Sequence, residues 1–173
     1  MRLALVGFGT VGQGVAEAVA MKKDLLFDRF GTELKIVAAF DSRTYAHDPK
    51  GLKPLDLVAR KQAGKSLGKT RPKSVAEMLP EMDYDVLVEM TPTNIKDAEP
   101  GYSNICSALK CSRDVVTSNK ELVSTRGSEL LAIAKEHNVN YMFEASVGGG
   151  IPLIRPLIFC LAGNEVQSIN GIL

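Results

Sequence analysis

An α/β fold with a doubly wound parallel sheet is predicted by three features of the sequence. Short apolar runs alternate with segments of helical periodicity over roughly the first 140 residues. A glycine-rich hexapeptide joins the first run to the first helical segment, and later runs end in loops rich in Thr, Ser, Asn and Gly. Because strand-helix-strand units cross over with one hand, this alternation places helices on both faces of one sheet.

Five short apolar runs are the predicted strands of that sheet. Buried parallel strands read as continuous apolar segments rather than as an alternation, and that is the pattern found here. Turn-forming or charged residues bound each run. The predicted strands are Arg2–Val6, Lys35–Phe40, Asp85–Met90, Asp114–Thr117 and Val139–Phe143.

Helices are predicted between these strands. The first follows the glycine-rich hexapeptide and has apolar side chains at helical spacing. A short one opens at a capping box, residues 74–77, and stops at Pro80. Two more are expected around Tyr102–Lys110 and in the segment that ends near Asn138.

The segment Ser42–Lys73 breaks this pattern. It is rich in Gly and Pro, and its nine Lys and Arg side chains face only two Asp residues. Such a run of like charges is typical of a solvated surface segment. We therefore predict a solvated insertion between elements of the sheet.

Bulk composition argues against several classes of function. The net formal charge of +1 gives no reason to expect nucleic acid or an anionic membrane as a partner. No apolar run approaches the ~20 residues of a membrane helix and no signal-like sequence is present, so a cytoplasmic location is expected. The three cysteines and two histidines lack the spacing of a transition-metal site.

The first loop carries the glycine spacing of a dinucleotide site. Gly-x-Gly-x-x-Gly is a weak signal alone, but here it follows a predicted strand and opens a helix, as in a Rossmann fold. Gly7 permits the tight turn, Gly9 lets the backbone approach a pyrophosphate, and Gly12 lets helix and strand pack closely. The helix N-terminus adds free N–H groups and positive potential. A glycine-rich corner that binds nothing is the alternative.

The residues after the second strand bear on the choice of cofactor. Asp41 ends that strand, where an acid accepts hydrogen bonds from the adenosine ribose and favours NAD. Arg43 lies two residues further on, and its guanidinium can pair with the 2′-phosphate of NADP. Lys61, in the basic insertion, is a further candidate for that phosphate. We therefore predict a nicotinamide dinucleotide and leave NAD and NADP both open.

Four later segments resemble one enzyme family and occur in its order. They are VEMTPTN at 88–94, VVTSNK at 115–120, FEASVGGGIP at 143–152 and AGNEVQSINGIL at 162–173. Together with the glycine turn, the resemblance to homoserine dehydrogenase extends from Gly7 to Leu173. It implies NAD(P)-dependent interconversion of L-homoserine and L-aspartate 4-semialdehyde, a step of threonine and methionine biosynthesis, with a small amino acid as substrate.

The resemblance also implies roles for individual residues. Thr91 and Ser118 would line the nicotinamide side, and residues 8–11 would contact the pyrophosphate through their backbone. Lys120 resembles the family's catalytic lysine, which relays the hydroxyl proton when hydride leaves the alcohol carbon; a surface lysine at a loop end is the alternative. The predicted cofactor residues are Gly7, Phe8, Gly9, Thr10, Val11, Gly12, Asp41, Arg43, Thr91, Ser118 and Lys120.

A monovalent-cation loop is implied by the same resemblance. Glu144 would supply a carboxylate, and Val147, Gly149 and Ile151 would supply backbone carbonyls, around a sodium ion. Glycine frees the backbone to turn such carbonyls inward. A tight turn between domains is the equally weighted alternative.

The end of the chain changes in texture. A predicted helix, Pro152–Leu161, is followed by a strand-like run, Val166–Leu173, that stops without a turn or a partner strand. Enzymes of the resembling family continue into a substrate domain. We therefore predict a Rossmann NAD(P)-binding domain at residues 1–146 and the start of a truncated α+β substrate domain at residues 147–173. The resemblance implies a homodimer for the full-length enzyme, with exposed apolar surface near the end of this chain.

Two other functions stay open at this stage. A stand-alone NAD(P)-binding module or sensor without turnover would lack a substrate domain. A related dehydrogenase, such as aspartate dehydrogenase, would share the N-terminal fold, although the segment VGGGIP at 147–152 argues against it. A sensor would bind NADH and ignore homoserine, so a titration with both separates it from the enzyme.

Overall fold

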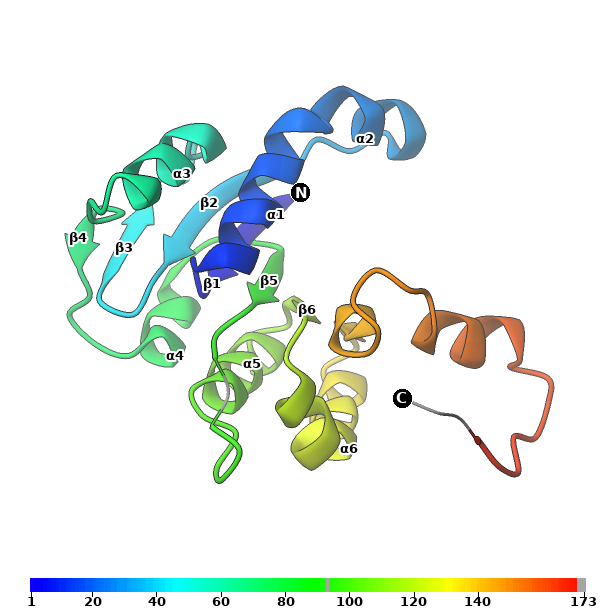
Figure 1. Ribbon diagram of the computed structural model, residues 1–173. Coiled ribbons are helices and arrows are strands. Elements are labelled where there is room, and N and C mark those ends of the chain that lie inside the picture. The colour runs from blue at the N-terminus through cyan, green and yellow to red at the C-terminus, as the bar shows by residue number, and fades with distance from the viewer. Residues whose placement is uncertain (93, 171–173) are drawn as a thin grey trace.

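One seven-stranded sheet organises the protein. The computed structural model describes residues 1–92 and 94–170 (Figure 1). The strand order is β4-β3-β2-β1-β5-β6-β7, and β1, β2, β5, β6 and β7 are mutually parallel. The strand bounds are β1 Arg2–Val6, β2 Lys35–Phe40, β3 Thr44–His47, β4 Lys69–Thr70, β5 Val86–Glu89, β6 Asp114–Thr117 and β7 Tyr141–Met142. The five predicted strands are confirmed, each within two residues at either end.

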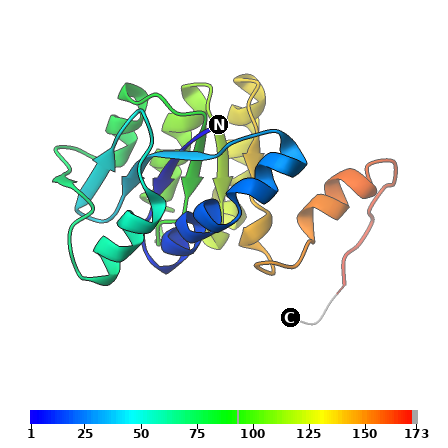
Figure 2. The same cartoon turned by 90° about the horizontal axis from the view of Figure 1, so that it is seen from above.

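Helices cover both faces of the sheet, which confirms the doubly wound arrangement. Figure 2 shows α1 and α3 on one face and α4, α5 and α6 on the other. The helix bounds are α1 Thr10–Met21, α2 Lys23–Phe30, α3 Pro54–Gln62, α4 Val75–Met78, α5 Gly101–Lys110 and α6 Lys120–Glu136. None of the described helices combines the length and apolar character needed to cross a bilayer.

Two apolar clusters hold the helices against the sheet. On the α1 side, Leu5 and Ile36 are fully buried. On the α5 side, Leu87, Ile105 and Leu122 are fully buried in a second cluster. Burying side chains of this size stabilises the fold by about 1.5–3 kcal/mol each, so the sheet and its loops form a fixed frame for a site.

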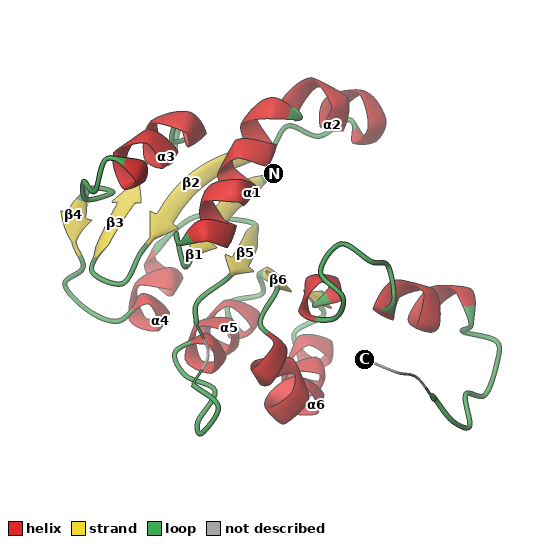
Figure 3. Ribbon diagram, in the orientation of Figure 1, coloured by secondary structure: helices red, strands yellow, loops and turns green. Residues whose placement is uncertain are grey.

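The prediction of a solvated insertion at Ser42–Lys73 is wrong. This segment forms β3, α3 and β4 (Figure 3), and β3 pairs antiparallel with both β2 and β4. The side chains of Leu57, Val58 and Leu67 are 4%, 5% and 3% exposed beneath α3 and the following loop. The charged residues occupy the outer surface. The prediction relied on the number of charges and overlooked the three apolar residues that pack against the sheet. The sheet is therefore extended by two antiparallel strands at one edge.

The capping box at the start of α4 is confirmed. The Ser74 hydroxyl accepts a hydrogen bond from the Glu77 N–H at 3.3 Å, and the Ser74 N–H donates to the Glu77 carboxylate at 3.0 Å. These two bonds give hydrogen-bond partners to the backbone N–H groups of Ser74 and Glu77, which have no partner within the helix. The capping box fixes where the chain turns into α4 after Lys73.

Beyond β7 the chain leaves the sheet (Figures 1 and 2). The predicted helix at Pro152–Leu161 appears as π-helical turns at Pro156–Cys160. The strand-like run has no regular structure over residues 166–170 and pairs with none of the described strands; residues 171–173 and Thr93 lie outside the described residues. Exposed fractions of 67% at Ile151 and 60% at Phe159 match the expected apolar surface.

Candidate functional site

A cleft of about 1570 Å³ lies at the carboxyl ends of the parallel strands. The loops after β1, β2, β5 and β6 line it together with residues 70–77 and the start of α5, at the edge where ligands bind in open α/β sheets. Ten of the predicted cofactor residues line it: Gly7, Phe8, Gly9, Thr10, Val11, Asp41, Arg43, Thr91, Ser118 and Lys120. Gly12 lies behind the turn, and none of the four predicted cation ligands lines the cleft.

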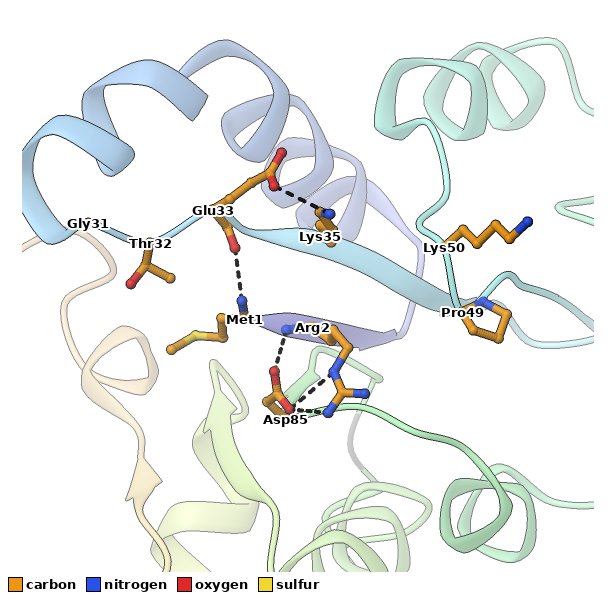
Figure 4. A pocket seen from close by; sticks show the side chains of 9 residues that line it. All are labelled: Met1, Arg2, Gly31, Thr32, Glu33, Lys35, Pro49, Lys50 and Asp85. Carbon is orange, nitrogen blue, oxygen red and sulfur yellow. Dashed lines mark hydrogen bonds and ion pairs between the residues drawn. The ribbon is translucent and has the colours of Figure 1, made fainter.

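A second hollow, of about 690 Å³, lies at the opposite end of β1 (Figure 4). Its charged groups contact one another. The Arg2 guanidinium lies 2.6 Å from the Asp85 carboxylate, and the Lys35 ammonium lies 3.4 Å from the Glu33 carboxylate. The Met1 amino group donates to the Glu33 carbonyl at 2.9 Å. These contacts join the amino ends of β1, β2 and β5, so the larger cleft is the candidate site.

The three glycines of the turn have different surroundings. Gly7 has a φ of +96°, and a Cβ there would lie 2.5 Å from the Met90 carbonyl carbon. A Cβ at Gly12 would lie 2.5 Å from the Gly7 carbonyl oxygen. A Cβ at Gly9 would meet no atom within 4 Å. Gly7 and Gly12 are therefore required by the fold, whereas Gly9 is open toward the cleft.

Backbone N–H groups at the start of α1 point to anion binding. Gly7 and Phe8 already donate to the Phe40 carbonyl, at 3.0 and 2.9 Å. The first turn of α1 leaves the N–H groups of Thr10 and Val11 without intrahelical partners. Within residues 8–11, the backbone N–H groups that remain free to bind a ligand therefore come after Phe8. The side chain of Phe8 is buried in the core. Free donors at a helix N-terminus attract a phosphate group.

Asp41 is engaged by several donors at the end of β2. One carboxylate oxygen accepts from the backbone N–H groups of Arg43 and Thr44 at 2.9 and 2.6 Å, and the other accepts from the Lys61 ammonium at 2.8 Å. Burial raises the pKa of Asp41, but the Lys61 contact and the hydrogen bonds from Thr44 and Arg43 lower it to about 2. Asp41 is therefore an anion that holds Lys61 at the cleft.

Basic side chains gather near Asp41. Arg43 is exposed, and its guanidinium has no hydrogen-bond or ion-pair partner among the described residues. The Arg71 guanidinium donates to the Ser42 carbonyl at 2.5 Å, and its Nε is buried without a partner in the described part of the chain. Sequence reasoning missed Arg71, because nothing in the local pattern shows that the chain after β4 brings it against the Ser42 carbonyl at the cleft.

A buried carboxylate connects the loops after β5 and β6. Glu89 is 0% exposed, and its Oε1 accepts from the Thr91 N–H at 2.9 Å and from the Thr91 hydroxyl. Its Oε2 accepts from the Thr117 hydroxyl at 3.3 Å and from the Asn119 side-chain amide at 3.4 Å. Burial raises the pKa of Glu89 above its usual value, because these hydrogen bonds act in the opposite direction but offset only part of the desolvation. Sequence reasoning missed Glu89, because an acid inside a strand carries no local signal.

Lys120 is the first residue of α6 and is exposed at the cleft wall. Asn119 caps this helix, since its side-chain oxygen accepts from the Leu122 N–H at 3.3 Å. The Asn119 amide nitrogen also donates to the Thr91 carbonyl at 3.3 Å. The loop that carries Ser118 and Lys120 is thus held against the loop that carries Thr91.

Glu144 lies outside the cleft, after β7. Its carboxylate accepts hydrogen bonds from the N–H groups of Leu153, Ile154 and Arg155 at 2.6, 3.0 and 2.7 Å. Although desolvation raises the pKa of Glu144, these backbone donors and the Arg155 charge lower it below its usual range. In the described residues, no group of three or more His, Cys, Asp or Glu could hold a metal ion.

The parallel sheet, the glycine turn, the free amides of α1 and the acid at the end of β2 define a Rossmann-type dinucleotide-binding domain. The sequence profile described as "Homoserine dehydrogenase, NAD binding domain" matches residues 7–144. The chain belongs to the homoserine dehydrogenase family, as its NAD-binding domain.

Similar proteins carry the same family name. A homoserine dehydrogenase of Methanocaldococcus jannaschii is 39% identical over 100% of this chain and 52% of its own length. An NAD(+)-dependent homoserine dehydrogenase of Pseudomonas canavaninivorans is 35% identical over 99% of this chain and 50% of its own length. A mutant hyperthermophilic archaeal homoserine dehydrogenase, solved in complex with NADPH, is 28% identical with a TM-score of 0.79, over 94% of this chain and 49% of the other. The chain thus spans about half the length of these relatives.

Proposed function

We propose that this chain is the cofactor-binding part of an enzyme that interconverts L-homoserine and L-aspartate 4-semialdehyde with NAD(P). The observation that carries this proposal is the position of Lys120 in the same cleft as the glycine turn and Asp41. A hydride acceptor and a proton acceptor must both reach one alcohol group in this reaction. Family membership supports the substrate, because the relatives share this name.

The cofactor residues fit a dinucleotide that spans the cleft. The backbone N–H groups of Gly9, Thr10 and Val11 bind the pyrophosphate, and Asp41 accepts a hydrogen bond from the adenosine ribose. Thr91 and Ser118 line the nicotinamide end. When bound, the nicotinamide accepts or supplies the hydride.

Lys120 acts on the proton of the reacting hydroxyl. Its side chain lines the cleft from the first turn of α6, whose start Asn119 caps. As hydride leaves the carbon, the neutral amine of Lys120 accepts the hydroxyl proton, and in the reverse direction the resulting ammonium returns that proton to the aldehyde oxygen. Loss of this amine therefore removes proton transfer, while the backbone contacts to the pyrophosphate stay in place.

Both NAD and NADP fit the adenosine end. Asp41 favours a free ribose hydroxyl, whereas Arg43 and Lys61 can pair with a 2′-phosphate. One relative is named NAD(+)-dependent and another was solved with NADPH. We expect Arg43→Ala and Lys61→Ala to weaken NADPH binding more than NADH binding, and calorimetric titration with each cofactor measures both affinities.

The enzyme proposal is tested by titration and by turnover. The chain is expected to bind NADH, and homoserine is expected to tighten that binding only in the full-length protein. Lys120→Ala in the full-length protein is expected to abolish most turnover and to change cofactor affinity by no more than a few-fold. A full-length protein that binds NADH and never turns over homoserine is a sensor, and unchanged turnover removes Lys120 from the mechanism.

We also propose a sodium site in the loop after β7. Glu144, Val147, Gly149 and Ile151 supply a carboxylate and three carbonyls, which are hard oxygen ligands. The positive φ of +60° at Gly149 supports the proposal, because it allows the backbone to turn a carbonyl inward. The carboxylate already accepts three amide hydrogen bonds, so a cation would use its remaining lone pairs. A higher melting temperature in NaCl than in choline chloride of equal concentration would support it, and equal values would exclude it.

We propose a domain boundary at residue 146, and a cytoplasmic homodimer for the full-length enzyme. The exposed apolar side chains of Ile151, Phe159 and Ile169 support a partner surface after that boundary. Free cysteines support a reducing compartment.

Three experiments test these proposals separately. Sedimentation of the full-length protein tests the dimer, and cell fractionation tests the location. Limited proteolysis at residues 146–151 tests the boundary.

A further inference from the structure

Glu89 is the most deeply buried acid that the described structure pairs with no cation. It is 0% exposed, and no lysine, arginine or histidine lies within ion-pair distance of it in the described part of the chain. A buried carboxylate without a cationic partner is energetically unfavourable, so the groups around it must offset the cost of its burial.

The contacts of Glu89 favour the charged form. Each carboxylate oxygen faces a nitrogen that can only donate, the Thr91 backbone N–H at 2.9 Å and the Asn119 side-chain amide at 3.4 Å. The Thr117 hydroxyl adds a further donor at 3.3 Å. These donors offset part of the lost hydration, although burial outweighs them and the pKa of Glu89 stays above its usual value, so the loops are organised around this carboxylate.

The anion lies directly beneath the end of the cleft next to Lys120. Thr91 and Asn119 both line the cleft, and both bond to Glu89 from above. A Cβ at Gly101 would lie 3.4 Å from Glu89 Oε2, so the start of α5 closes the other side of the carboxylate. Water is therefore excluded, and the field of the charge is weakly screened.

We propose that Glu89 is a positioning residue that ties together the loops after β5 and β6 and makes this end of the cleft prefer the cationic, oxidised nicotinamide over its reduced form. This inference rests on the proposed function, because it places the nicotinamide end of the dinucleotide beside Thr91. The two cofactor forms differ by one charge, and that charge is on the ring. A fixed negative charge near the ring therefore stabilises the cationic, oxidised form and gives no such stabilisation to the neutral, reduced form.

The test compares binding of NAD+ and NADH by wild type and variants of this chain. Glu89→Gln removes the charge with little change of shape, and it is expected to lower the ratio of NAD+ affinity to NADH affinity roughly tenfold. Glu89→Asp keeps the charge and is expected to weaken both cofactors with the ratio within about twofold of wild type. Glu33→Gln, at the opposite end of the sheet, controls for net charge and should leave both affinities unchanged.

The outcomes separate this inference from the proposed function. Wild type that binds neither cofactor overturns the proposed function. Wild type that binds both, with the same affinity ratio in a folded Glu89→Gln variant, overturns only the role of Glu89. If circular dichroism shows that this variant does not fold, Glu89→Asp carries the test, and a shift of more than about twofold in the affinity ratio of this charge-conserving variant overturns the inference.

Discussion

Gly7→Ala is expected to destabilise the fold, because the new methyl group would overlap backbone atoms, and no side-chain movement can remove that overlap. A Cβ at Gly7 would lie 2.5 Å from the carbonyl carbon and oxygen of Met90 and 2.7 Å from the Thr91 nitrogen. These are main-chain atoms of the loop after β5, so β1 and β5 must separate at their ends. An alanine at positive φ costs about 1–2 kcal/mol, and overpacking costs about 1–3 kcal/mol. The expected loss is about 2–5 kcal/mol.

Gly9→Ala is the matched control for this prediction. Gly9 has a φ of −87°, and no atom lies within 4 Å of its Cβ position. Alanine is a weaker N-cap than glycine by about 0.5 kcal/mol, and the smaller entropy of its unfolded chain offsets a similar amount. Stability should therefore change little, while the new methyl group obstructs a pyrophosphate and weakens NADH binding.

Thermal unfolding followed by circular dichroism compares the two variants. For a chain of this length, 1 kcal/mol corresponds to a shift of about 2–4 °C in melting temperature. Gly7→Ala should lower the Tm by roughly 5–15 °C, and Gly9→Ala by less than about 2 °C. Equal melting temperatures for the two variants would refute the steric reasoning, since both replace glycine by alanine in one turn.

Three further predictions concern the fold and the cleft. Leu57→Ala should cost about 3 kcal/mol in urea unfolding, because it leaves a cavity under α3; a loss below about 0.5 kcal/mol would mean that α3 does not pack there. Ser74→Ala should cost about 1 kcal/mol and speed amide exchange in α4, and unchanged exchange would argue against the capping box. Because the pKa of Asp41 is about 2, its stabilising effect is complete above about pH 4 and is lost as the pH falls toward 2. Lys61→Ala should raise that pKa, and an NMR titration showing no change would contradict the ion pair.

Local patterns were sufficient to predict the parallel part of the sheet. The strand Arg2–Val6 and the strand Lys35–Phe40 were predicted with the bounds that the structure shows. Both are continuous apolar runs bounded by turn residues, and a buried parallel strand requires that pattern. The glycine turn was also predictable, since the backbone there needs a residue that adopts positive φ.

The edge of the sheet could not be predicted in this way. Ser42–Lys73 reads as a charged segment, yet Leu57, Val58 and Leu67 anchor it to the face beside α1. Three apolar residues among many charges give no clear periodicity. Their burial against β2 and α1 and the pairing of β3 with β2 show that the segment is folded, and the Lys61–Asp41 contact at 2.8 Å follows from this arrangement.

The sequence by itself determined the class of fold and the place of the glycine turn, because each depends on residues that are neighbours in the chain. Tertiary structure alone decided that Glu89 joins the loops of Thr91 and Asn119, that Lys61 contacts Asp41, and that Arg71 contacts the Ser42 carbonyl. The physical reason is that these contacts connect residues from separate elements, and no local spacing specifies which side chains a folded sheet brings within hydrogen-bond distance.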